Sequence, residues 1–174
     1  AIAEMPDICS KNNKVGVLYK ATVNHADGKL TEIPLLDCVA DMQIVLGWDL
    51  LAGDCNEGND GQVDTWSNAT RTAANLVTIK DSASSCSAGA SAIEVDAVMK
   101  DPKKLRESLK IIKVYILAQQ SGRDINYTGA DKILVGDDQE KSLVREYVFD
   151  DDMKSYRWKV HRIVARPMNL IANQ

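Results

Sequence analysis

The sequence predicts an α+β fold dominated by antiparallel sheet, and three observations lead to this prediction. Short runs of β-branched and aromatic residues recur along the chain, turn residues separate these runs, and one segment carries a strong helix-start signal. The chain has 174 residues, of which 45% are hydrophobic, and this is enough for one domain with a proper core. We therefore expect a single globular domain over residues 1–174.

The N-terminal part is expected to form a β-hairpin. The run VGVLYKATV at residues 15–23 favours a strand, and the Asp27-Gly28 turn separates it from a second extended run that begins at Leu30. Pro34 cannot donate to a sheet ladder, so we expect it at an edge or a bend. The following segment, LLDCVADMQIVLGW, predicts a short turn and then a strand over residues 42–48.

The middle of the chain is predicted to be a long loop followed by a helix and a strand. Residues 51–92 contain many small and polar residues and indicate a loop region. A short helix is expected near residues 101–109, because Asp101 can cap the free amides and Pro102 suits the first helical position. Next, KIIKVYILAQQ carries apolar residues on both faces, as expected for a central strand covered on both sides.

The C-terminal part predicts two strands, residues 143–149 and 156–166, joined by the acidic turn DDDMKS. Apolar and cationic side chains alternate along the second strand, as in an antiparallel sheet with one solvated face. Its apolar face would consist of Tyr156, Trp158, Val160 and Val164.

An oxygen-rich run, GDCNEGNDGQVDTW at residues 53–66, suggests a calcium loop, because Ca²⁺ takes six to eight oxygen ligands from a tightly curled chain. The candidate ligands are Asp54, Asn56, Asp60 and Asp64. The spacing does not fit an EF-hand, since Gly61 at position 6 would place Gly58 at position 3 and Ser67 at position 12. A hydrated acidic turn is therefore the alternative, and no cofactor other than Ca²⁺ is suggested.

Four cysteines, Cys9, Cys38, Cys55 and Cys86, lack the spacing of a zinc or thioredoxin-type site. Their even number, and the polar surroundings of Cys9, Cys55 and Cys86, favour disulfides formed in an oxidising compartment. Three pairings are possible, and we favour Cys55 with Cys86 and Cys9 with Cys38. Four free thiols in a cytosolic protein are the alternative.

The sequence also disfavours several functions. A net charge of −4 and a pI near 5.2 disfavour nucleic-acid binding, which needs concentrated Lys and Arg. The chain has no nucleophile elbow, zinc-protease motif, phosphate loop or dinucleotide fingerprint. We expect both histidines, His25 and His161, to be surface residues, and we predict no catalytic site.

The order of three segments resembles the C-terminal globular region of PilW-type minor pilins, which are related to the J-type pseudopilins of type II secretion. These segments are LLDCVADMQIVLGWD with NDGQVDTW, then DPKKLRESLKIIKVYILAQQSGRDINYT, then KSLVREYVFDDDMKSYRWKVHRIVARPMNL. The resemblance covers roughly residues 15–170. It consists of strand patterns rather than invariant catalytic residues.

This resemblance implies a pilin-like head that acts as a structural or assembly subunit of a type IV pilus or related filament outside the cytoplasm. Its partners would be other pilin subunits, and Arg145, Arg157 and Arg162 are the contact candidates because we expect them to be exposed. Their alternative role is a solvated strand face that offsets the acidic turns. A second possible function is an extracellular module that binds Ca²⁺ or a glycan through residues 54–64.

Members of that family carry a long N-terminal apolar helix that anchors them in the membrane, and this sequence does not match that part. Glu4 cannot replace the glutamate of that helix, because Pro6 and polar residues follow it. We expect either that the chain is truncated or that the helix lies on a separate polypeptide. That helix would be the only membrane contact. The piece should then expose sheet edges or an apolar strip.

Overall fold

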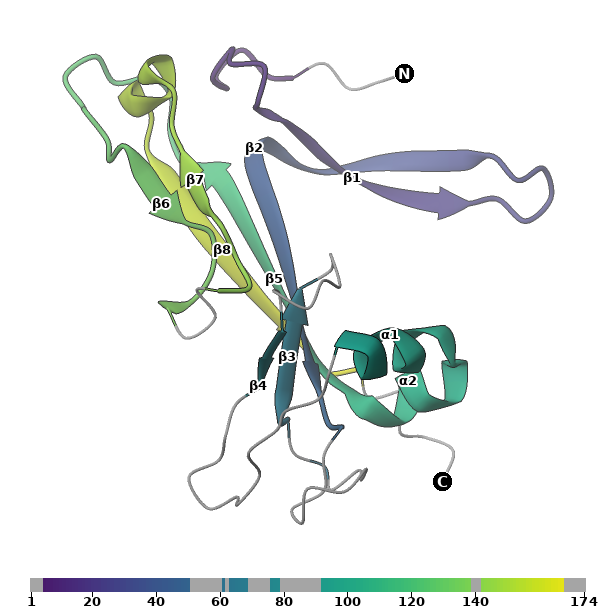
Figure 1. Ribbon diagram of the computed structural model, residues 1–174. Coiled ribbons are helices and arrows are strands. Elements are labelled where there is room, and N and C mark those ends of the chain that lie inside the picture. The colour runs from purple at the N-terminus through teal and green to yellow at the C-terminus, as the bar shows by residue number, and fades with distance from the viewer. Residues whose placement is uncertain are drawn as a thin grey trace. The chain divides into compact units, whose positions relative to one another are not determined.

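The computed structural model describes residues 5–50, 61, 63–68, 76–78, 92–138 and 142–167 (Figure 1). The chain divides into two compact units that alternate along the sequence. Unit 1 comprises residues 1–42, 116–135 and 146–161, and unit 2 comprises residues 43–115, 136–145 and 162–174. The described strands are mainly antiparallel and are accompanied by two short helices, which confirms the predicted fold class.

The main sheet has the order β4-β3-β2-β5-β8, and β1 also pairs with β2. Its strands are β1 (Gly16–Val23), β2 (Leu30–Trp48), β3 (Thr65–Asn68), β4 (Leu76–Thr78), β5 (Leu109–Gln119) and β8 (Trp158–Ala165). β1 and β3 both run antiparallel to β2, with Val23 opposite Leu30 and Trp48 opposite Thr65. The predicted strand in KIIKVYILAQQ is therefore confirmed as β5, which lies between β2 and β8.

Strand β2 is continuous over 19 residues, so the predicted turn before residue 42 is wrong. The chain bends without interrupting the strand, because β2 contains extra residues relative to β1. Leu18 lies opposite Leu36 while Gly16 lies opposite Val39, so three residues of β2 match two of β1. Such bulges increase the local twist of a strand. Cys38, at φ 56°, occupies the left-handed conformation in the bulged segment.

The predicted disulfide between Cys9 and Cys38 is confirmed, with the two Cα atoms 5.2 Å apart. Both cysteines are buried, and the bond ties the segment before β1 to the bulge of β2. The second predicted disulfide, between Cys55 and Cys86, lies outside the described residues.

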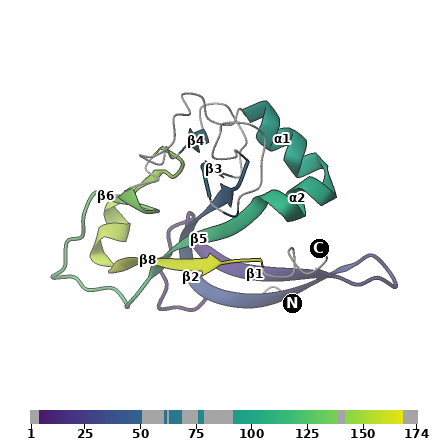
Figure 2. The same cartoon turned by 90° about the horizontal axis from the view of Figure 1, so that it is seen from below.

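The predicted helix near residues 101–109 is confirmed as α2 (Pro102–Ser108). The Asp101 carboxylate accepts hydrogen bonds from the backbone N–H groups of Lys103 (2.9 Å) and Lys104 (3.4 Å), as an N-cap should. Helix α2 runs directly into β5 (Figure 2). The preceding helix, α1 (Ala92–Lys100), was not predicted.

Residues 51–92 were predicted to be loop, and this is wrong for the parts that form β3 and β4. These short strands complete one side of the sheet, and Thr65, Trp66 and Ser67 of β3 are buried. Three or four residues carry too weak a local signal to be distinguished from loop, because their pairing with β2 supplies most of their stability.

Unit 2 is built around Trp48, whose side chain is fully buried with Val95 and Val98 of α1. The Trp48 Nε1–H donates to the Ser67 hydroxyl over 2.8 Å, so the buried indole is satisfied across the β2–β3 pair. Partly buried apolar side chains surround this cluster: Leu46, Leu50, Met99, Leu105 and Leu109.

Unit 1 is built around an aromatic cluster in the C-terminal part. Strands β6 (Lys132–Leu134) and β7 (Glu146–Val148) form a separate antiparallel pair, and a 3₁₀ helix, η3 (Asp151–Ser155), follows β7. The Phe149 ring stacks on Trp158 with centroids 5.4 Å apart, and Met153 is fully buried. The Trp158 Nε1–H donates to the Met153 carbonyl over 2.8 Å.

The two predicted C-terminal strands exist, but β8 does not have one solvated and one covered face along its whole length. Residues 161–165 are all exposed, and Val164, predicted to face the core, is 46% exposed. Alternation along one strand predicts which side chains share a face, but the neighbouring elements decide whether that face is covered.

Candidate functional site

The predicted calcium loop is only partly described. Asp54, Asn56 and Asp60 lie outside the described residues, so their role stays a prediction. Asp64 lies beside β3, where its Oδ2 accepts from the Leu50 N–H (2.8 Å) and its Oδ1 from the Thr65 hydroxyl (2.6 Å). Within the residues that the structure describes, no group of three or more His, Cys, Asp or Glu side chains could hold a metal ion.

The sequence analysis missed a buried carboxylate, Asp49, at the end of β2. Its side chain is fully buried, and its Oδ2 accepts from the Gly61 N–H over 2.7 Å. The Lys110 ammonium lies 3.3 Å from the same oxygen. A buried charge needs such partners, so Asp49 fixes Gly61 against β5 through two charge-assisted contacts. The sequence signal that could have revealed this carboxylate is its position directly after the strand predicted over residues 42–48.

The three predicted contact arginines lie in different surroundings, and their contact role stays a prediction. Arg145 is exposed. Arg157 bonds to Asp124 over 3.2 Å, and its guanidinium carbon lies 4.1 Å from the centre of the Tyr127 ring. These contacts belong to unit 1 and orient the side chain along the protein surface.

Arg162 belongs to a polar cluster around Asp137 in unit 2. The Asp137 carboxylate accepts from Arg162 (2.8 Å) and from the Tyr115 hydroxyl (2.9 Å), and the Lys113 ammonium is 4.0 Å away. Burial works to raise the pKa of Asp137, but these hydrogen bonds and the charges of Arg162 and Lys113 outweigh it and hold the pKa below its ordinary value. Lys113 also lies over the Trp66 ring, 4.3 Å from its centre.

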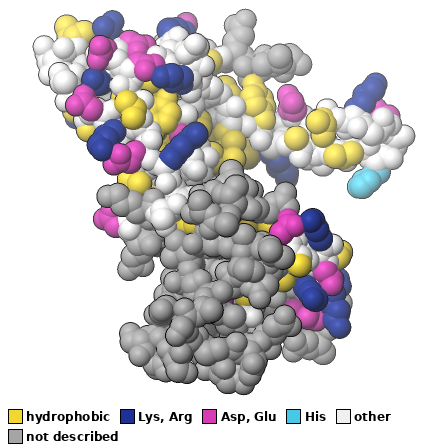
Figure 3. Space-filling view, viewed as in Figure 1, with side chains coloured by type: hydrophobic (Ala, Val, Ile, Leu, Met, Phe, Trp, Pro, Cys, Tyr) yellow, Lys and Arg dark blue, Asp and Glu magenta, His cyan; other side chains and the backbone are white. Residues whose placement is uncertain are grey.

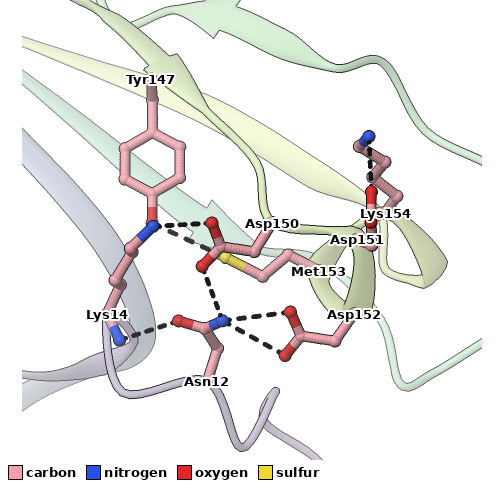
Figure 4. A network of polar contacts seen from close by, with 8 residues as sticks. All are labelled: Asn12, Lys14, Tyr147, Asp150, Asp151, Asp152, Met153 and Lys154. Carbon is pink, nitrogen blue, oxygen red and sulfur yellow. Dashed lines mark hydrogen bonds and ion pairs between the residues drawn. The ribbon is translucent and has the colours of Figure 1, made fainter.

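A second polar network joins the N-terminal segment to η3 within unit 1 (Figure 4). The Asn12 amide donates to Asp150 over 3.0 Å and to both oxygens of Asp152 over 3.1 and 3.2 Å. The Lys14 ammonium bonds to Asp150 over 2.7 Å, which raises the pKa of Lys14. In the same turn Lys154 bonds to Asp151 over 2.9 Å. Asp150 and Asp151 are thus each paired with a lysine, and Asp152 is hydrogen-bonded by the neutral Asn12 amide.

The most unusual surface is the hairpin arm, which we define as residues 18–36 of β1, the connecting turn and β2 (Figure 3). Every residue from 20 to 37 is exposed. The arm nevertheless carries five large aliphatic side chains with high exposed fractions: Val23 (52%), Leu30 (60%), Ile33 (47%), Leu35 (59%) and Leu36 (37%).

These side chains project from both faces of the arm. Val23 and Leu30 lie opposite each other on one face, whereas Ile33 lies opposite Lys20 on the other. At the base of the arm, an open groove of about 380 Å³ is lined by residues 13–18 and 39–42, which include Asn13, Lys14 and Asp41 beside the apolar side chains. A two-stranded hairpin is marginally stable alone in water, so aliphatic side chains exposed on both faces distinguish the arm from an ordinary solvated hairpin.

His25 and His161 are both exposed, as predicted. Among the described helices, none is long and apolar enough to cross a membrane.

Searches against protein-family models, curated proteins and solved structures returned no match for this chain.

Proposed function

We propose that this protein is a structural or assembly subunit, a minor pilin or pseudopilin, of a type IV pilus or related filament outside the cytoplasm. It acts through contacts with other subunits and has no catalytic site. The observation that supports this most is the hairpin arm, whose exposed aliphatic residues would be covered in an assembly. The Cys9–Cys38 disulfide supports an oxidising compartment.

The energetic argument follows from burial of the arm. Each aliphatic side chain that moves from water into an interface contributes about 25 cal/mol per Å² of apolar surface. Leu30 and Leu35 are each about 60% exposed, so a partner has much of both side chains left to cover. The fully buried centre of an interface is more apolar than its polar rim, so the aliphatic side chains of the arm fit the centre of such a contact.

The test is binding of this chain to purified candidate filament subunits from the same organism, measured by isothermal titration calorimetry. Ile33→Glu and Leu35→Glu should each weaken binding by about tenfold or more, because each places a charge in the covered surface. Ile125→Glu is the matched control, since Ile125 is 82% exposed and lies outside the arm. Binding that all three substitutions leave unchanged would count against the proposal.

The calcium or glycan module remains the second candidate. Asp64 already accepts two hydrogen bonds, so a bound cation would have to share its oxygens with Leu50 and Thr65. Calorimetric titration with Ca²⁺ decides the matter: binding at millimolar concentration or tighter that disappears in Asp60→Ala and Asp64→Ala would favour the module.

A further inference from the structure

The outer edge of β1 is a second unusual feature of the hairpin arm. Within the described parts of the chain, β1 pairs with β2 only. An edge strand presents backbone N–H and C=O groups that can pair with another chain, and proteins commonly protect such edges with charged residues. The β1 sequence GVLYKATV has one charged residue, Lys20, among residues of high β propensity.

The edge strand β8 differs from β1 in this respect. Its eight residues, WKVHRIVA, include Lys159, His161 and Arg162. Cationic side chains on an edge discourage pairing between sheets, because two such edges repel each other. β8 therefore carries two permanently cationic residues, Lys159 and Arg162, whereas β1 has Lys20 alone and is the less protected edge.

The pairing of β1 with β2 determines which backbone groups point outward. The Asn24 N–H donates to the Lys29 carbonyl across the hairpin over 2.8 Å. Opposite pairs alternate between hydrogen-bonded and non-hydrogen-bonded, so Val23 with Leu30 and Ala21 with Glu32 are non-hydrogen-bonded pairs. By the same alternation, Pro34 and Tyr19 form a non-hydrogen-bonded pair, which suits Pro34 because it has no N–H. The N–H and C=O groups of Ala21 and Val23 therefore face the outer edge.

We propose that β1 pairs antiparallel with β1 of a second copy of this chain, about a two-fold axis at Ala21, to form a four-stranded β2–β1–β1–β2 sheet. This inference rests on the proposed function, because it names the partner of the hairpin arm as another copy. A two-fold contact uses the same patch on both subunits, so the patch must be complementary to itself.

The β1 sequence satisfies that condition. With Ala21 opposite its own copy, Tyr19 lies opposite Val23 of the second copy, an aromatic–β-branched pair that stabilises sheets. Lys20 lies opposite Thr22, so the two lysines are diagonal neighbours on one face rather than a directly opposed pair. The outward groups of Ala21 and Val23 then fall in the hydrogen-bonded positions of the new ladder.

The paired arms would also form a wider apolar surface. Val23 and Leu30 of each copy lie on the face that carries Tyr19, Ala21 and Glu32, so the four-stranded sheet would carry the two Val23–Leu30 pairs on one face, one on each side of the two-fold axis. Three or more strands with a shared apolar face are stable where two strands are marginal.

Cysteine cross-linking tests the register directly. In the proposed sheet the two Ala21 Cα atoms are about 5.5 Å apart, which suits a disulfide, so Ala21→Cys should give a covalent dimer on a non-reducing gel. Thr22→Cys is the matched control, because its Cα would lie about 7–8 Å from its copy and outside that range. Dimer from Ala21→Cys alone supports the register, and equal cross-linking of the two variants overturns it.

Sedimentation equilibrium tests the association without cross-linking. Ala21→Pro removes an outward N–H that β2 does not use, so the fold should persist while the association constant falls about tenfold or more. Thr22→Glu places a carboxylate opposite Lys20 and should raise the constant about two- to tenfold, whereas Thr22→Lys should lower it by a similar factor. Equal constants for all four chains would overturn the inference.

The same variants separate this inference from the proposed function. If the chain is monomeric at millimolar concentration and Ala21→Pro still weakens binding to other filament subunits, homotypic pairing is wrong and the assembly role stands. If Ala21→Pro changes neither self-association nor that binding, both fail.

Discussion

The Cys9–Cys38 disulfide gives the sharpest stability prediction for this protein. The double substitution Cys9→Ala/Cys38→Ala opens a loop whose ends are 29 residues apart. By the loop-closure relation this separation corresponds to about 3.6 kcal/mol at 25 °C. That is a large part of the 5–15 kcal/mol that typically holds a domain folded, so unit 1 should unfold at a clearly lower urea concentration.

A second substitution distinguishes loss of the cross-link from change of the backbone at the same site. Cys38 has φ 56°, a conformation that costs an ordinary residue about 1–2 kcal/mol and costs glycine little. Cys9→Ala/Cys38→Gly should therefore recover about 1 kcal/mol relative to the double alanine variant, although both lack the disulfide.

Urea denaturation followed by circular dichroism measures both effects, with Cys55 and Cys86 retained in every variant. The denatured state without the cross-link is less compact, so the slope of the transition should rise as its midpoint falls. A loss below about 1 kcal/mol for the double alanine variant would refute the loop-closure reasoning. A glycine variant that is less stable than the alanine variant would refute the backbone argument.

Three further predictions concern other parts of the fold. Gly136→Ala should destabilise by about 1–3 kcal/mol, because its Cβ would lie 2.6 Å from Val144 Cγ2, and adding Val144→Ala should restore part of the loss in the same urea assay. Trp48→Phe should cost about 1–3 kcal/mol by removing the donor to the buried Ser67 hydroxyl, and a Ser67→Ala background should reduce that cost. Hydrogen bonds from Lys14 and Asn12 hold the pKa of Asp150 below 3.8. A lowered carboxyl pKa contributes stability that is present above the unfolded value and is lost as the pH falls through the folded value. Asp150→Asn should therefore lower the urea midpoint at neutral pH, and the difference should shrink as the pH falls below 3.8.

The sequence by itself determined the elements whose signals are local. The capping aspartate Asp101 and Pro102 define the start of α2 within a single turn, and the Asp27-Gly28 turn with its flanking β-branched residues defines the hairpin. The apolar residues on both faces of β5, including the run from Val114 to Ala118, also sufficed to place a strand near the centre of a sheet. Each signal depends on residues a few positions apart.

Only the tertiary structure decided which strands pair and which faces are covered. β2 continues through Pro34 because that residue falls at a non-hydrogen-bonded position opposite Tyr19, and its bulges depend on a register that no local pattern contains. Val164 alternates like a core residue yet is exposed, whereas Asp49 is buried because Gly61 and Lys110 supply its partners. Burial and pairing depend on residues far apart in sequence, and the free energy of those contacts outweighs the small local preferences of the chain.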